Sequence, residues 1–352
     1  MIFTGDIAQP FVGASKYMVP EELKSKLWFG NLEGSLIDGS NKKEDVGGVY
    51  NDVEAIKALL KQVPFKAFII ANNHLLDVAD VKTTLDNVKY LGVHTVGAGC
   101  NLQEAQDSIA FIDNDGISYR ILAFGWENIQ CDSADTKKQG VNPYTRKNVF
   151  RCVSEALKGK ESVICFMHWD YELEKYPHPY DRQLAHELID RGVAAVIGCH
   201  AHCVQPIEFY RGKPIVYGLG NFLFCQGHYF GGNLRHSYLC EKEYVFEITG
   251  QGYKMYYCGY DLHKNCLKFE KEVEIDPDNA FEGKAVFTGM SAKEYERFFK
   301  KHRVQNKLLP IFHTKESEVS YWVKSEWIML RGWLIDLMTK ANLKSANRLE
   351  RK

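Results

Sequence analysis

The feature that most constrains this chain is a recurring pair: a short apolar run and a polar residue directly after it. The run FKAFIIA at residues 65–71 has the Phe, Ile and Ala content of a buried strand, yet it stops at Asn72, Asn73 and His74. Burying three such side chains unpaired is costly, so they need partners. An Asn can cap a following helix, but that explains only one of the three. Similar runs end at Asp6, Glu33 and His168 and just before His200 and His202.

Segments with helical spacing of apolar residues separate these runs. They lie at residues 52–62, 77–92 and 180–192, and a glycine that can end a helix closes the last two. Hairpins are predicted at residues 108–126 and 205–221, where turn residues stand between two strand-like runs. The chain therefore alternates strands with helices, which is the pattern of a layered α/β fold.

We assign this α/β domain to residues 1–285, with antiparallel strands over residues 240–275. Residues 286–352 have a helical pattern and are expected to form a C-terminal helical extension. Its segment YWVKSEWIMLRGWLIDLMTK, residues 321–340, sets three Trp among Lys and Arg. Such a helix is typical of a membrane surface, or it packs on the domain or on a second subunit in an oligomer. The packed helix is the favoured interpretation.

Composition narrows the class of partner and the compartment. The 352 residues carry a formal net charge of −1, so no bulk charge favours nucleic acid. The apolar runs are too short to cross a bilayer, and the start MIFTGDIAQP lacks the features of a secretory signal. The 10 cysteines are scattered, which predicts buried free thiols in a reducing compartment. We therefore expect a cytoplasmic protein, at most peripheral to the inner membrane.

The polar residues at the strand ends predict a metal site. In open α/β sheets, ligands bind at the edge formed by the carboxyl ends of the strands. Two carboxylates, one amide oxygen and three imidazoles suit one or two divalent ions such as Mn²⁺, Zn²⁺ or Fe²⁺. A carboxylate between two ions can bridge them, and they activate a water molecule. The predicted ligands are Asp6, Glu33, Asn73, His168, His200 and His202.

Simpler roles compete with this site. A single His after a strand is more often a hydrogen-bonded structural residue, and Asp6 and Glu33 can be turn or loop residues. His200 and His202 would lie on opposite faces of an ideal strand, so a shared site needs a turn, which Gly198 is expected to permit. The segment CHAHC also resembles a zinc cage, although a closed site from five adjacent residues is difficult to build. The coincidence at several strand ends favours one shared metal site.

Several motifs together resemble the CapA family, the poly-γ-glutamate and capsule biosynthesis group of the calcineurin-like metallophosphatase superfamily. The resemblance covers roughly residues 1–285 and implies a four-layer α-β-β-α sandwich with a dinuclear metal centre in the loops above the sheets. The motifs are GD at 5–6, NLEG at 31–34, ANNHLLD at 71–77, GAG at 97–99, HWDYE at 168–172, LIDRGVAAVIGCHAHCVQPIE at 188–208 and YRGKPIVYGLGNFLF at 210–224.

The resemblance also implies roles for single residues. Asp6 takes the position of the first ligand and Glu33 that of the bridging carboxylate, while Asn73 and the three histidines complete the set. His74 matches the general acid that protonates the leaving group, and Asp77 is placed to orient it. The candidates for substrate binding, or for supporting the ligands, are Asn31, Asn72, Asp170, Glu172 and Asn221.

Two departures from the family pattern stand out. Phosphatases of this superfamily usually have a His two residues after the first Asp, and here that position is Ala8, so one metal position is expected to be weaker. Asp170 stands where the family often has Gly, and an extra carboxylate disfavours a phosphate dianion more than an amide or a sugar.

The predicted function is that of a metal-dependent hydrolase acting on a phosphoester or amide bond. Its expected substrate is a small or polymeric precursor of the cell envelope, in capsule, exopolysaccharide or poly-γ-glutamate biosynthesis. The alternative is a non-catalytic metal-binding accessory protein of an envelope polymer assembly machine. A glycosidase that uses Glu33 and Glu172 would leave the histidines unexplained.

Overall fold

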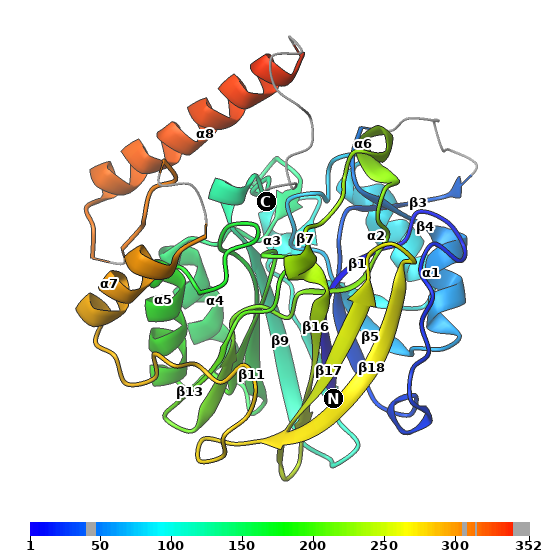
Figure 1. Cartoon of the computed structure of the whole chain (residues 1–352), viewed down its shortest axis with the longest axis horizontal. Helices are drawn as coiled ribbons and strands as arrows, with labels where there is room; N and C mark the ends of the chain where they lie inside the picture. Colours follow the sequence, from blue (N-terminus) through cyan, green and yellow to red (C-terminus); the bar gives the residue numbers. More distant parts are fainter. Residues whose placement is uncertain (40–46, 305–307, 314, 341–352) are drawn as a thin grey trace.

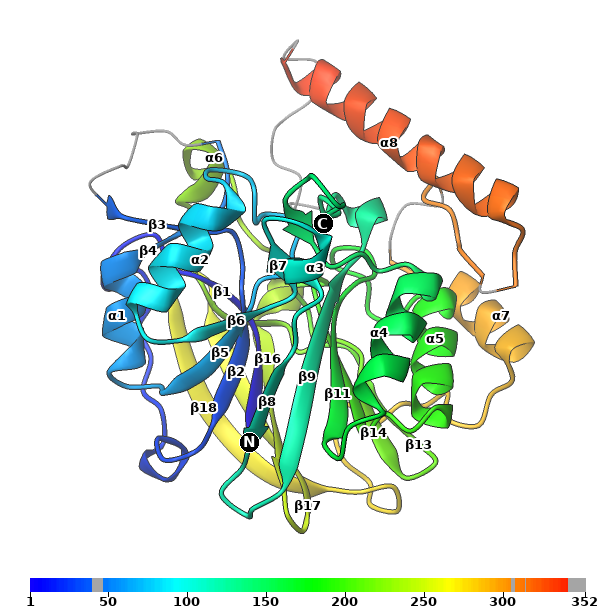
Figure 2. The same ribbon diagram turned by 180° about the vertical axis from the view of Figure 1, so that it is seen from behind.

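Two β-sheets face each other in the computed structural model, which describes residues 1–39, 47–304, 308–313 and 315–340. Helices α1 and α2 lie on one flank of the sheets, and α4 and α5 lie on the other (Figure 1, Figure 2). The helices are α1 (Val53–Leu60), α2 (Val81–Tyr90), α3 (Leu102–Ala105), α4 (Arg146–Ala156), α5 (Pro179–Asp190), α6 (Tyr229–Gly232), α7 (Ala292–His302) and α8 (Glu318–Lys340).

The larger sheet has the order β18-β17-β16-β1-β2-β5-β6, and β15 also pairs with β1. Neighbours from β1 to β6 are parallel, whereas β16, β17 and β18 form an antiparallel meander. Its strands are β1 (Ile2–Ala8), β2 (Trp28–Leu32), β5 (Phe65–Ile69), β6 (His94–Val96), β15 (Asn221–Phe224), β16 (Lys242–Thr249), β17 (Gly252–Asp261) and β18 (Cys266–Ile275).

The second sheet has the order β13-β14-β12-β11-β9-β8, with parallel strands in the middle and an antiparallel strand at each edge. Two small pairs, β3 with β4 and β7 with β10, stand apart from both sheets. The remaining strands are β3 (Ser35–Ile37), β4 (Tyr50–Asp52), β7 (Ala98–Gly99), β8 (Ile109–Ile112), β9 (Ser118–Gly125), β10 (Gly140–Val141), β11 (Ser162–His168), β12 (Ala195–Cys199), β13 (Ile207–Tyr210) and β14 (Lys213–Val216).

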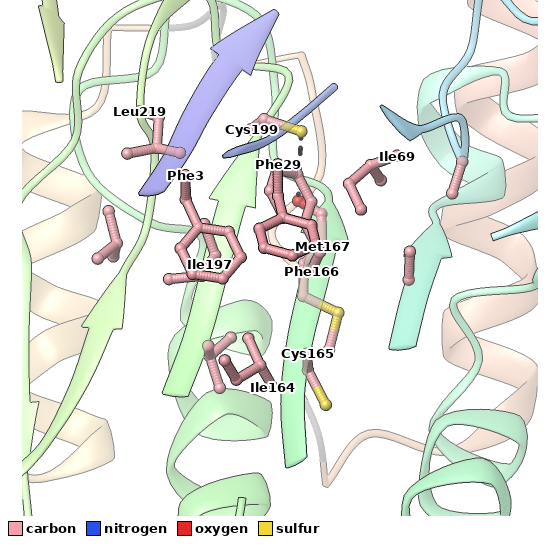
Figure 3. Packing of buried hydrophobic residues seen from close by; sticks show 14 of the residues in the cluster. Phe3, Phe29, Ile69, Ile164, Cys165, Phe166, Met167, Ile197, Cys199 and Leu219 are labelled. Carbon is pink, nitrogen blue, oxygen red and sulfur yellow. Dashed lines mark hydrogen bonds between the residues drawn. The ribbon is translucent and has the colours of Figure 1, made fainter. Parts of the chain in front are cut away.

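The main core fills the space between the two sheets. Phe3 of β1 lies against Phe29 of β2 with ring centroids 5.4 Å apart, and against Phe166 of β11 at 6.5 Å. Figure 3 shows these rings facing each other with Ile197 of β12 beside them. Burying each of these side chains contributes about 1.5–3 kcal/mol, so the core under the strand ends holds the sheets together.

The α/β class and the sandwich of two sheets between helices are confirmed. Both predicted hairpins form, as β8–β9 and β13–β14, and the antiparallel strands after residue 240 form as β16–β18. Helix α2 starts at Val81 rather than near residue 77, because the Asp80 side chain accepts from the Thr83 N–H and caps the helix there. Gly92 follows this helix with a φ of +74°, a conformation that favours glycine.

Part of the C-terminal extension packs on the domain. Tyr295 and Phe299 of α7 are buried, and the Trp126 indole donates to the Tyr321 hydroxyl of α8 over 2.9 Å. Residues 341–352 of the predicted extension lie outside the described residues, and the boundary at residue 285 stays a prediction. In the part of the chain that the structure describes, no helix combines the length and apolar character needed to cross a membrane. All 10 cysteines are free, and eight of them are buried.

Candidate metal centre

Strand ends from both sheets bring six predicted ligands into one cluster. Asp6 lies in β1 and Glu33 follows β2, which is the parallel neighbour of β1. His168 ends β11, and His200 and His202 follow the adjacent β12 of the second sheet. The Asp6 Oδ2 atom is 3.1 Å from His202 Nδ1, so the two sheets contribute to the same site.

One half of the cluster is built around His168. Its Nε2 atom lies 2.7 Å from Asn73 Oδ1 and 3.1 Å from His200 Nδ1. Its Nδ1 atom lies 3.2 Å from the sulfur of Cys199. Glu33, His168 and His200 each offer a donor atom within 4.8 Å of the others. Two ring nitrogens, an amide oxygen and a carboxylate oxygen therefore converge as they do around a divalent cation.

The other half of the cluster is built around Asp6. Asp6, Glu33 and His202 form a second set of donor atoms within 4.8 Å of one another. His202 Nδ1 also lies 3.0 Å from Asn221 Oδ1, and its Nε2 lies 4.0 Å from Glu33 Oε1. Because Glu33 belongs to both sets, it has the place that a bridging carboxylate would occupy.

The backbone after β12 turns both histidines toward the cluster. His200 has a φ of +96° and His202 a φ of +56°, and their ring centroids are 5.9 Å apart. Such angles are uncommon for residues other than glycine and indicate a constrained loop. The turn predicted at these histidines exists, but Gly198 does not supply it. Gly198 lies inside β12, where a Cβ atom would stand 2.0 Å from the carbonyl oxygen of Tyr217.

The carboxylates of the cluster are better satisfied by a bound cation than by the hydrogen bonds available to them. Asp6 Oδ2 and Glu33 Oε1 are buried, and neither makes a well-formed hydrogen bond among the described residues, although Asp6 Oδ2 has the 3.1 Å contact with His202 Nδ1. The other oxygen of each carboxylate accepts from the Asn31 side-chain amide, over 2.8 and 2.9 Å. Burying two carboxylate oxygens without a well-formed hydrogen bond is costly, and a bound cation would remove that cost.

The electrostatics agree with this fit. Burial, followed by the nearby Asp6, raises the pKa of Glu33 well above its ordinary value. Burial also raises the pKa of Asp6, but contacts with His202, His168 and Asn31 together outweigh it and the net shift is downward. Burial lowers the pKa of His168 to about 3 and that of His200 well below 6.5. The two imidazoles are therefore neutral, which is the form that binds metal.

His74 and Asp77 form a pair at the mouth of the cluster. His74 Nδ1 lies 2.7 Å from Asp77 Oδ2, while His74 Nε2 points toward Glu33 Oε1 at 3.9 Å. Their side chains are 18% and 23% exposed, so this is the part of the site that a substrate can reach. Their roles in catalysis stay predictions.

The remaining predicted residues have different surroundings. Asn72 holds the turn, because its Oδ1 accepts from the Gly34 and His74 N–H groups and its Nδ2 donates to Leu32 O. Both oxygens of the buried Asp170 accept from protein donors, namely the N–H groups of Tyr171 and His178 and the Gln205 amide. Glu172 follows in the same loop and is half-buried. Direct contact of Asn31, Asn72, Asp170, Glu172 or Asn221 with a substrate stays a prediction.

Two residues near the cluster were not predicted. Cys199 joins Asp6 and His168 in a third set of donor atoms within 4.8 Å, and its position directly before His200 was the available signal. Cys203, the other cysteine of CHAHC, instead lies 3.4 Å from Glu174 O, which argues against a zinc cage in that segment. His236 packs on His202 with ring centroids 4.6 Å apart, and nothing in its sequence surroundings indicated this.

The fold and the cluster define a class: an α/β sandwich whose strand ends carry a buried site suited to divalent cations. Residues 6–226 match the family of the bacterial capsule synthesis protein PGA_cap, and the chain belongs to that family. The family resemblance drawn from the motifs is thereby confirmed.

Curated relatives agree with this assignment. The chain is 32% identical to the PGA biosynthesis protein CapA of Bacillus subtilis over 216 residues, which cover 60% of this chain and 57% of that protein. It is 29% identical to the capsule biosynthesis protein CapA of Bacillus anthracis over 181 residues, 49% of this chain and 43% of that one. The chain therefore spans about half the length of these relatives. The NAD nucleotidase of Haemophilus influenzae superposes over 80% of this chain and 54% of its own, with a TM-score of 0.33 and 13% identity.

Proposed function

We propose that this chain is a divalent-metal-dependent hydrolase that acts on a precursor of an envelope polymer. The membership in the capsule synthesis family supports the biological setting, and so do the names of the two Bacillus relatives. The bond to be cleaved is a phosphoester or an amide, because both pass through a transition state with developing negative charge on oxygen.

The observation that carries the proposal is a pair of buried carboxylate oxygens that make no well-formed hydrogen bond and lie among the imidazoles of the cluster. These oxygens are Asp6 Oδ2 and Glu33 Oε1, which make no hydrogen bond within the described part of the chain and lie 3.1 Å and 4.0 Å from the ring nitrogens of His202. Bound divalent ions would supply an activated water molecule and stabilise negative charge on the substrate. Asp6, Glu33, Asn73 and the three histidines would hold them.

The other residues of the site would handle the leaving group. Asp77 accepts from His74 Nδ1–H and orients the ring, so that Nε2 is directed into the site. When water attacks and the scissile bond breaks, His74 transfers the Nε2 proton to the departing atom. The burial of the cluster and the partial exposure of this pair support a proton donor on the substrate side.

A second candidate is an accessory protein that binds metal without catalysis. Ala8 favours it, because this side chain belongs to an apolar cluster with Val49, Tyr50 and Phe224 and offers no ligand. The Asp6 half of the site would then bind its ion weakly. The His74–Asp77 pair favours the hydrolase, since a scaffold has no use for a proton donor.

The test begins with metal binding and then turns to activity. Protein freed of metal with a chelator is titrated with Mn²⁺ and Zn²⁺ by calorimetry, beside the double variant His200→Ala with His202→Ala. The variant should stay folded and lose binding. Loaded protein is then assayed on phosphoesters, γ-glutamyl amides and sugar derivatives. Metal binding without hydrolysis of any of them would favour the accessory role, and equal binding by wild type and variant would contradict the site.

A further inference from the structure

His236 is a buried histidine beside the candidate metal centre that no motif included. It lies in the loop after α6, beyond the family-matched residues 6–226. The side chain is 7% exposed, and its ring centroid lies 4.6 Å from those of His202 and Phe224. It therefore touches a predicted ligand without belonging to the family pattern.

Hydrogen bonds to Gln226 determine which ring nitrogen of His236 carries the proton. The Gln226 Oε1 atom accepts from the backbone N–H of His236 over 2.7 Å, which identifies the other atom of the amide as the nitrogen. That nitrogen donates to Phe224 O over 3.0 Å and lies 2.8 Å from His236 Nδ1. Since the amide nitrogen can only donate, Nδ1 must accept, and the neutral ring carries its proton on Nε2.

The Nε2–H group has nothing to donate to. It is buried, and within the described residues it has no hydrogen-bond partner, a costly state that native proteins rarely tolerate. A metal is the wrong partner, because a nitrogen that carries a proton has no free lone pair. In agreement, none of the donor sets found among the described residues includes His236. The group is therefore suited to an oxygen atom that accepts a hydrogen bond.

We propose that His236 binds an anionic oxygen of the ligand held at the metal centre, donating to it through Nε2–H. The inference rests on the proposed function, because it takes the ligand to lie on the ions beside His202. A phosphoryl or a carboxylate oxygen has the required chemistry. Gln226 acts through His236 as a positioning residue that keeps the proton on Nε2.

The first test measures the binding of inorganic phosphate and of a γ-glutamyl dipeptide to Zn²⁺-loaded protein by calorimetry. His236→Phe keeps a ring against His202 and Phe224 but removes the donor, and it should weaken anion binding about 10-fold to 100-fold. His236→Gln restores an N–H near the same place and should recover part of the loss. His228→Phe is the matched control, since His228 bonds to Tyr50 instead, and it should bind like wild type. Loss with phosphate alone would identify a phosphoryl ligand, and loss with the dipeptide alone a carboxylate.

The second test observes the tautomer by nitrogen NMR of histidine-labelled protein. His236 should show a protonated Nε2 and an unprotonated Nδ1, and the Nε2–H signal should shift when anion is added. The Gln226→Leu variant should lose this preference. A proton on Nδ1 would overturn the inference, as would Zn²⁺ affinity and anion affinity both unchanged in His236→Phe. If wild type binds no metal, the proposed function fails and this inference fails with it. Metal binding by wild type together with unchanged anion affinity in the variant refutes this inference alone.

Discussion

Replacing Glu33 with Gln should have opposite effects on the stability of the metal-free and the metal-loaded protein. Gln has the shape of Glu without its charge. Glu33 is fully buried near Asp6, and its Oε1 atom has no hydrogen-bond partner in the described structure. Removing this carboxylate should therefore leave metal-free protein at least as stable as wild type. In the presence of metal the variant should be less stable than wild type, because Glu33 belongs to two sets of donor atoms and its loss weakens metal binding.

The size of the effect follows from linkage. A cation that binds only the folded protein stabilises it by about 2.7 kcal/mol at a concentration of 100 times its Kd. The entropy of unfolding is about 2.1 cal/mol/K per residue, or about 0.7 kcal/mol/K for 352 residues, so the Tm of wild type should rise by about 4 °C. If the variant binds about 100-fold more weakly, the same concentration adds only about 0.4 kcal/mol and moves the Tm by less than about 1 °C.

Differential scanning calorimetry of chelator-treated protein, with and without Mn²⁺, measures both effects. Glu155→Gln is the matched control, because Glu155 lies on α4 with its side chain 71% exposed and pairs only with Lys158 among the interactions described. It should show the full shift of wild type. An equal Mn²⁺-induced shift in Glu33→Gln and wild type would refute the bridging role. A metal-free variant several degrees less stable than wild type would refute the view of Glu33 as an uncompensated buried carboxylate.

Three further substitutions test the proposed proton donor, a buried carboxyl group and the core. His74→Asn should lower turnover on any substrate that wild type cleaves by a factor of about 10²–10⁴. Elemental analysis should find the same metal content as in wild type, and a loss of metal would show that His74 is a ligand instead. Burial raises the pKa of Asp181 from 3.8 to about 8. Between these values Asp181 keeps its proton in the folded protein and loses it in the unfolded protein. The free energy of unfolding of wild type should therefore fall as pH rises from about 4 to about 8. Asp181→Asn should therefore gain stability over wild type between pH 4 and pH 8 in urea titrations, and a constant difference would contradict the assignment. Phe166→Ala should cost about 3–5 kcal/mol in the same assay, and a cost below about 1 kcal/mol would place Phe166 outside the core.

The sequence predicted the fold class and the members of the cluster because both depend on local pattern. A strand such as β5 is recognisable from its own residues, and the carboxyl ends of parallel strands meet at one edge whatever the loops do. Asp6 and Glu33 follow from this rule, since β1 and β2 are parallel neighbours. His168 and His200 follow in the same way from β11 and β12.

The details that were not predicted depend on contacts between segments that are far apart in the sequence. Gly198 was expected to permit the turn after β12, yet it is needed in the strand because the Tyr217 carbonyl comes too close for a side chain. The strain falls instead on His200 and His202. His236 stands in a loop with no recognisable motif, and only the packing of that loop against His202 reveals its place.

The centre depends on the whole fold because the two sheets contribute different ligands to it. Asp6, Glu33 and Asn73 come from the larger sheet, whereas the three histidines come from the second sheet, so each half of the centre needs both. Their meeting is set by the packing of Phe3 and Phe166, which lie between the sheets beneath the strand ends. A change in that core should therefore alter metal affinity as well as stability, whereas a change in a ligand such as His200 should alter metal affinity and leave the core intact.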